Sequence, residues 1–268
     1  MPMKIVIILA SCAGFASVTL AGGVNIISDA NSTATFNTGS GQIDWTVDGV
    51  SQLFTQEFYF RRASDTREYR VDTNNLTLDG IFMSDTNPFS DTSNDAIAQL
   101  YSDGNGLQIE TIFTIRGGTA GSSAADIAET IIIRNNSAST MNISFFQFVD
   151  FDLGGDALDD NGQIVGGNTA MQNDNDTFIS ETVATPAPSF FQMGNAATMA
   201  NMFNDGLIDN LNNNPSDSGD VAWAFQWDIT LAAGQQYIIT KDKSIVPAPG
   251  SIMLLGAAGL IAGRRRRN

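Results

Sequence analysis

Apolar and polar residues alternate over many short stretches of the chain, a pattern that predicts β-strands. The expected strands are residues 43–47, 57–62, 99–102, 107–116, 127–134, 141–153, 221–229 and 235–240. In 107–116 every second residue from Leu107 to Ile115 falls on one face, because side chains alternate along a strand. Asp103-Gly104-Asn105-Gly106 precedes this stretch and supplies the residues with positive φ that tight turns need. We therefore expect a hairpin between 99–102 and 107–116.

The longest candidate strand, 141–153, is apolar on both faces in its first half. Phe145 falls on one face, and Phe146 and Phe148 fall on the other. A strand covered on both faces belongs in the interior of a layered structure. Helical spacing occurs in 196–212 and is broken at Asp205-Gly206. Many short strands, Gly/Asn/Asp turns and little helix predict an all-β fold, an antiparallel β-sandwich.

The N-terminal end differs from this middle. Lys4 is followed by an apolar run and by small residues up to Ala21, which is typical of a secretory signal peptide cleaved after residue 21. The residues that end at Cys12 also match a lipobox, so lipidation of Cys12 is the alternative. We divide the chain into a signal peptide (1–21), an all-β exported domain (22–244) and a C-terminal tail (245–268).

The tail joins a Pro-x-Pro motif to an apolar run and an arginine cluster. The motif consists of Val246, Pro247, Ala248 and Pro249. Prolines fix φ and lack an N–H group, so we expect no strand or helix to carry through it. The uncharged run 252–263 predicts a short transmembrane helix. The cluster of Arg264, Arg265, Arg266 and Arg267 then acts as a stop-transfer block that stays cytoplasmic.

This tail resembles the PEP-CTERM sorting signal, which some domain libraries label an ice-binding-protein C-terminal domain. The family usually carries Glu between the prolines, where this chain has Ala248. The resemblance implies export, transient membrane anchoring and cleavage near the Pro-x-Pro motif by an exosortase. The implied partners are therefore the exosortase and the export machinery. The implied place of action is the cell surface or the extracellular matrix, in a structural or exopolysaccharide-associated role.

Composition narrows the chemistry that the exported domain can perform. The chain has no histidine, and its one cysteine, Cys12, lies in the predicted signal peptide. Once that segment is removed, Ser-His-Asp triads, thiolate nucleophiles, disulfides and Cys/His zinc sites are excluded. All 29 acidic residues but only eight of the 13 basic ones lie in the exported domain, which gives a net charge of −21. Such a charge repels nucleic acid and anionic membranes and attracts cations.

An acidic segment follows the longest candidate strand. Its oxygen-bearing side chains are those of Asp150, Asp152, Asp156, Asp159, Asp160 and Asn161. Hard oxygen ligands on a glycine-containing loop are what Ca²⁺ requires, so the segment predicts a calcium site. A solvated acidic turn is the alternative, since Asp and Asn are common in turns.

Three functional classes remain. Six aromatic residues could stack on sugars if exposed, or face the core if buried: Trp45, Phe58, Tyr59, Phe60, Trp223 and Trp227. With 29 carboxylates, a pair suited to glycoside hydrolysis arises by chance. We expect an exported structural or matrix protein that is not an enzyme, with extracellular polysaccharide as a candidate partner. The alternatives are a carbohydrate-binding module and, after it, a carboxylate-dependent glycoside hydrolase.

Overall fold

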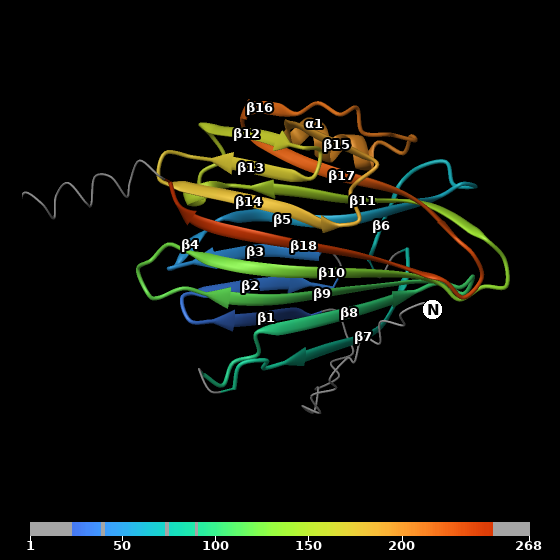
Figure 1. Cartoon of the computed structure of the whole chain (residues 1–268), viewed down its shortest axis with the longest axis horizontal. Coiled ribbons are helices and arrows are strands. Elements are labelled where there is room, and N and C mark those ends of the chain that lie inside the picture. Colours follow the sequence, from blue (N-terminus) through green and yellow to red (C-terminus); the bar gives the residue numbers. More distant parts are fainter. Residues whose placement is uncertain (1–22, 39–40, 73–74, 89–90, 249–268) are drawn as a thin grey trace, which may run out of the picture.

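The computed structural model describes residues 23–38, 41–72, 75–88 and 91–248. In this part of the chain two antiparallel β-sheets lie face to face, which confirms the predicted sandwich (Figure 1). The predicted signal peptide and the predicted C-terminal helix lie outside the described residues. Within the described residues, no helix is long and apolar enough to cross a membrane.

The first sheet, called sheet A, has nine strands in the described part of the chain. Its order is β1 (Val24–Asp29), β2 (Ser32–Asn37), β3 (Gly41–Val47), β5 (Leu53–Arg62), β11 (Met141–Phe151), β17 (Val221–Leu231) and β15 (Phe190–Asn195). Two short strands attach to it, β4 (Val50–Ser51) beside β3 and β6 (Tyr69–Arg70) beside β5.

Sheet B also has nine strands in the described residues. Its order is β16 (Ser216–Gly219), β12 (Asp160–Val165), β13 (Thr169–Asn173), β14 (Thr177–Thr185), β18 (Gln236–Pro247), β10 (Ala125–Asn135), β9 (Leu107–Gly117), β8 (Ala96–Ser102) and β7 (Thr77–Ser84). A 3₁₀ turn, η1 (Leu153–Gly155), begins the connection from β11 to β12.

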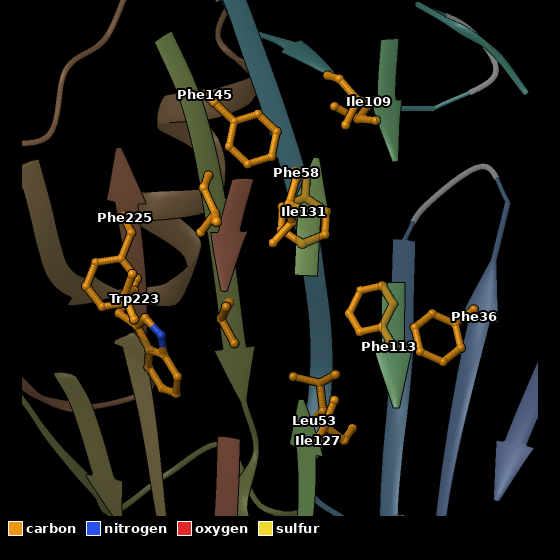
Figure 2. Packing of buried hydrophobic residues seen from close by; sticks show 14 of the residues in the cluster. Phe36, Leu53, Phe58, Ile109, Phe113, Ile127, Ile131, Phe145, Trp223 and Phe225 are labelled. Carbon is orange, nitrogen blue, oxygen red and sulfur yellow. The ribbon is translucent and has the colours of Figure 1, made fainter. Parts of the chain in front are cut away.

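The main core lies between the sheets, where inward-facing side chains of both interdigitate (Figure 2). Phe58 of β5 stacks on Phe145 of β11, with ring centroids 5.6 Å apart. The indoles of Trp45, Trp223 and Trp227 are fully buried. Their N–H groups donate to Ser32 Oγ, Glu181 Oε2 and the Pro186 carbonyl at 2.8–3.0 Å. Burial of a tryptophan is favourable only when its N–H finds such an acceptor.

A second apolar cluster covers the outer face of sheet A. The helix α1 (Ala196–Asn204) places Met199 and Phe203 against Phe146 and Phe148 of β11. Phe203 lies 5.6 Å from the Phe146 ring and stacks on Tyr59 at 4.7 Å. This confirms that Phe146 and Phe148 are covered. The helix ends at the predicted break, because Gly206 adopts φ 83°.

Two further predictions can be compared with the strands. β8 and β9 form the predicted hairpin, and the residues of β9 from Leu107 to Ile115 alternate between buried and half-buried.

β18 continues well beyond the predicted strand 235–240 and ends at Pro247, the first proline of the motif. It crosses the boundary drawn at residue 244. A strand can end on Pro247 because its neighbour Ala248 donates its N–H to the Asp176 carbonyl at 2.9 Å, so the ladder does not need the proline nitrogen.

Candidate functional site

A polar hollow of about 260 Å³ opens on the outer face of sheet A, beside the end of α1. We call it the tyrosine hollow; it is lined by Tyr59, Arg67, Glu68, Tyr69, Arg70, Asp72, Asn75, Phe203, Asn204 and Gly206. Most of these residues come from β5, β6 and the connections around β6, and the last three come from the end of α1. The hollow therefore forms where the helix stops covering the sheet.

Ion pairs and ring contacts hold the walls of the tyrosine hollow in place. The guanidinium of Arg70 contacts Glu57 Oε1 at 2.9 Å and Asp72 Oδ2 at 2.7 Å. Tyr59 donates its hydroxyl to Glu57, and burial together with that carboxylate raises the pKa of Tyr59. The exposed Arg67 lies over the Tyr69 ring, 4.9 Å from its centroid, and forms no ion pair with any other described residue. Its N–H groups are available to a ligand.

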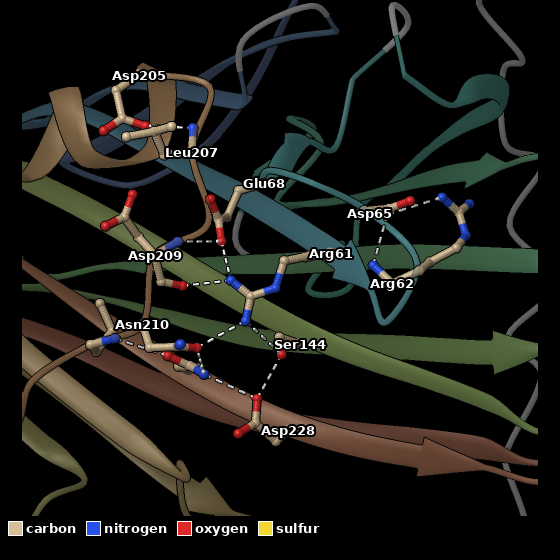
Figure 3. A network of polar contacts seen from close by, with 12 residues as sticks. Arg61, Arg62, Asp65, Glu68, Ser144, Asp205, Leu207, Asp209, Asn210 and Asp228 are labelled. Atoms are coloured by element: carbon tan, nitrogen blue, oxygen red, sulfur yellow. Dashed lines mark hydrogen bonds and ion pairs between the residues drawn. The ribbon is translucent and has the colours of Figure 1, made fainter.

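Arg61 of β5 anchors the segment that follows α1 (Figure 3). Its guanidinium pairs with Glu68, donates to the Asp209 carbonyl at 2.6 Å, and donates to Asn210 Oδ1 at 2.8 Å. Ser144 bridges from this group to Asp228 Oδ1 at 2.7 Å. A second hollow of about 360 Å³ lies on this side, lined by Arg61, Arg62, Ala63, Asp65, Asn142, Ile143, Ser144, Ile208, Asp228, Ile229 and Thr230.

A charged network lies in the middle of the sandwich, and the sequence analysis did not anticipate it. Lys241 Nζ lies 2.6 Å from Glu129 Oε2 and 3.0 Å from Glu181 Oε1, and Lys243 also pairs with Glu129. Gln56 of sheet A donates to Glu129 Oε2 at 3.0 Å. All of these side chains are almost wholly buried. The network therefore lies in the interior and links side chains of the two sheets.

The predicted calcium segment contributes to a real acid cluster, but with a different membership. One carboxylate oxygen each from Asp150, Asp152 and Asp220 lies within 4.8 Å of the other two. Asp220, between β16 and β17, stands 59 residues after Asn161, the last residue of the predicted site, and was missed. No short-range pattern in the sequence connects it to Asp150, because the β11–β17 ladder brings them together.

Crowding and burial raise the pKa values of these carboxyl groups. Burial, followed by the charges of Asp152 and Asp220, raises the pKa of Asp150 to about 7. Burial also raises the pKa of Asp160 to about 8, with Gln172 opposing the shift. The remaining predicted residues are spread along the loop: Asp156 accepts the Leu158 N–H at 2.8 Å, and Asp159 and Asn161 are exposed.

The other predicted site residues lie partly outside the described chain. Val246 and Pro247 end β18, and Ala248 is buried beside β14. Pro249 and the arginines Arg264, Arg265, Arg266 and Arg267 lie outside the described residues. The six aromatic residues singled out from the sequence are buried, the most exposed being Phe58 at 6%. They form core contacts, so an exposed aromatic surface built from them is excluded.

Comparison with solved structures shows the same fold in three proteins. A bacterial glucoamylase bound to acarbose superposes with a TM-score of 0.57 at 7% identity, over 88% of this chain and 36% of the glucoamylase. A putative aldose 1-epimerase from Escherichia coli K12 superposes at 0.50 with 11% identity, over 85% and 99% of the two chains. A galactose mutarotase-like protein from Lactobacillus casei superposes at 0.51 with 9% identity, over 83% and 100%. No protein-family model and no curated protein matches the sequence.

These likenesses correct one expectation from the sequence. The prediction that the protein is not an enzyme is contradicted, because the same two-sheet fold occurs in a glucoamylase and in a putative aldose 1-epimerase. The described residues include no histidine and no cysteine, which excludes particular catalytic groups among them, but an enzyme that uses carboxylates needs neither. At 7–11% identity the comparison establishes the fold and transfers no individual residue.

Proposed function

We propose that the protein binds a neutral saccharide in the tyrosine hollow. The observation that carries this proposal is the convergence of the half-buried Tyr69 ring with guanidinium groups, carboxylates and amides on one hollow. Sugars present adjacent hydroxyl groups, which planar carboxylate, amide and guanidinium groups bind two at a time. Their C–H groups can pack against an aromatic ring, and of the three rings that line the hollow Tyr69 is the half-buried one, since Tyr59 and Phe203 are 1% and 4% exposed. The sugar-related names of the structural neighbours support the same class of ligand.

The charge of the hollow favours a neutral sugar over an acidic one. Arg67 and Arg70 are balanced by Glu68 and Asp72 on the walls. Outside the hollow the exported domain carries a large excess of carboxylates, which repels polyanions at long range. An uncharged hexose or its oligomers therefore meets no electrostatic barrier, whereas a uronic-acid polymer does.

The hollow is also prepared for binding before a ligand arrives. Two contacts fix the α1 side of the hollow. Tyr59 stacks on Phe203, and Asn204 Nδ2 donates to the Ala200 carbonyl at 2.8 Å. The two ion pairs of Arg70 fix the opposite wall. Ligand binding therefore costs these groups little conformational entropy. Only the exposed Arg67 must become ordered on binding.

Isothermal titration calorimetry with neutral hexoses, their oligomers and a uronic-acid polymer tests this proposal. We expect binding of a neutral saccharide, weakened by about tenfold or more in R67A, because a charged hydrogen bond is lost. The matched control is R134A, which removes an arginine paired with Glu110 on the outer face of sheet B. If no neutral saccharide binds, or if R67A binds as tightly as R134A, the tyrosine hollow is not the site.

We also propose that the protein acts outside the cytoplasm, as the predicted signal peptide and PEP-CTERM-like tail imply. The segments that support this proposal, 1–21 and most of 245–268, lie outside the described residues. An exported saccharide-binding domain would act on extracellular polysaccharide at the surface or in the matrix. Assaying sugar release and anomeric exchange with the bound saccharides then separates binding from turnover.

A further inference from the structure

The acid cluster lies where the chain passes between the two sheets. Asp220 is the single residue between β16 of sheet B and β17 of sheet A, and Asp152 follows β11 on the way to β12. The β11–β17 ladder pairs Asp150 with Ala222, and the β12–β16 ladder pairs Asp160 with Gly219. Two connections that cross between the sheets therefore place their carboxylates side by side.

Buried oxygen atoms in this region lack hydrogen-bond donors. Asp150 is 8% exposed, and its Oδ1 accepts no hydrogen bond from a described residue. Asp160 is 1% exposed and neither of its oxygens accepts a hydrogen bond of normal geometry; the same holds for Gln172 Oε1. A buried acceptor without a donor is costly, and a buried anionic one more so.

Nothing among the described residues neutralises this cluster. None of the described lysines and arginines forms an ion pair with Asp150, Asp152 or Asp220. Lys241 and Lys243 instead pair with Glu129 in the sandwich interior. Asp150, Asp152 and Asp220 thus face one another without a basic partner, and Asp150 contributes a buried oxygen that accepts no hydrogen bond, which favours a bound cation.

We propose that Asp150, Asp152 and Asp220 bind a calcium ion. Ca²⁺ takes six to eight oxygen ligands at about 2.3–2.6 Å, so ligands on opposite sides of the ion stand roughly 5 Å apart. The observed separation, within 4.8 Å for every pair, fits that geometry. Asp160 and Gln172 border the site with further buried oxygens. The bound ion fastens the two crossing connections to each other and so joins sheet A to sheet B at this end.

Thermal unfolding of the full chain at neutral pH, in calcium chloride and in chelator, tests the proposal. A ligand that binds only the folded state raises the Tm with its concentration. At about a hundredfold excess over Kd the increase should be roughly 5–10 °C for a domain of this size. Magnesium chloride is the comparison ion, since Mg²⁺ requires shorter, octahedral contacts and loses its water reluctantly.

The variants D220N and D159N separate the site from general charge effects. D220N removes a ligand, so it should abolish the calcium-dependent increase; in chelator its Tm should equal or exceed that of the wild type, because one repelling charge is gone. D159N is the matched control, since it removes a charge from the same connection at an exposed residue, and asparagine tolerates its φ of 71°. D159N should keep the full increase.

Each other outcome overturns the proposal. An unchanged wild-type Tm in calcium means that the cluster holds no ion, and an equal shift with magnesium contradicts the calcium assignment. Retention of the full shift by D220N would place the ion elsewhere. D152N, at a half-buried residue, repeats the test if D220N does not fold.

Discussion

Replacing Glu129 with glutamine should destabilise the protein by ~3–5 kcal/mol, because removal of one partner leaves buried charges uncompensated. Glu129 is 2% exposed and contacts both Lys241 and Lys243. Burial opposes its ionisation, but the two ammonium groups outweigh burial and lower its pKa from 4.5 to about 2. The two ammonium groups therefore favour the ionised carboxylate, so this contribution to stability is present near neutral pH.

A double-mutant cycle separates the network from simple loss of packing. Four charges form the network: Glu129, Glu181, Lys241 and Lys243. E129Q alone leaves two lysines facing one glutamate. In E129Q/K243M the remaining pair, Lys241 and Glu181, is neutral and 3.0 Å apart. The double variant should therefore be more stable than the sum of the single changes predicts, by roughly 2–3 kcal/mol.

Urea denaturation at pH 7, followed by tryptophan fluorescence, measures these differences from the midpoint and slope. E110Q is the matched control, because Glu110 pairs with Arg134 at 2.8 Å on the surface, where both side chains are about a quarter exposed. Such a pair contributes about 0–1 kcal/mol. If E129Q costs no more than E110Q, or if the cycle shows no coupling, then the interior network does not hold the sheets together.

Two further predictions concern the stability of the protein at low pH and the processing of its two termini. Because the pKa of Glu129 is depressed, its contribution is present above the unfolded value near 4.5 and is lost as pH falls towards about 2. The stability gap between wild type and E129Q should shrink across that window in urea titrations, and a gap independent of pH would refute the assignment. Intact-mass analysis of protein from its native host should show a start at Gly22 and an end near Pro247. A lipid on Cys12 or a retained Arg267 would contradict one end or the other.

The sequence predicts the central strands well, because their patterns are locally complete. The hairpin at 103–106 has turn residues that require positive φ, and its second strand alternates without interruption. The strands between residues 160 and 195 were missed. β12 begins with Asp160-Asn161-Gly162, and β14 places Glu181 between Ile179 and Val183, so neither strand has an uninterrupted apolar face. β12, β13 and β14 pair with neighbours in sheet B, and β15 pairs with β17 in sheet A, so each of these strands depends on a partner that its own segment does not contain.

The candidate sites depend even more on long-range pairing. Asp150 and Asp220 meet only through the β11–β17 ladder, and the tyrosine hollow joins β5 and β6 to the end of α1. The interior charges did leave a local signal. Glu129 stands between Ile127 and Ile131 on one strand face, and Glu181 stands between Ile179 and Val183. A charge flanked two residues away on both sides by apolar residues predicts an inward-facing charge.

The interior network has a consequence for how the central strand β18 finds its place. β18 pairs with β10 on one side and β14 on the other, opposing Lys241 to Glu129 and Lys243 to Glu181. A slip of one residue would turn both lysines outwards and bring Asp242 into the interior. Glu129 and Glu181 would then face a third carboxylate with no cation, whereas an all-apolar interior would tolerate more alternatives. The buried Lys–Glu pairs, whose charges are costly to remove from water, thus select one register for β18, the strand that joins the two halves of sheet B.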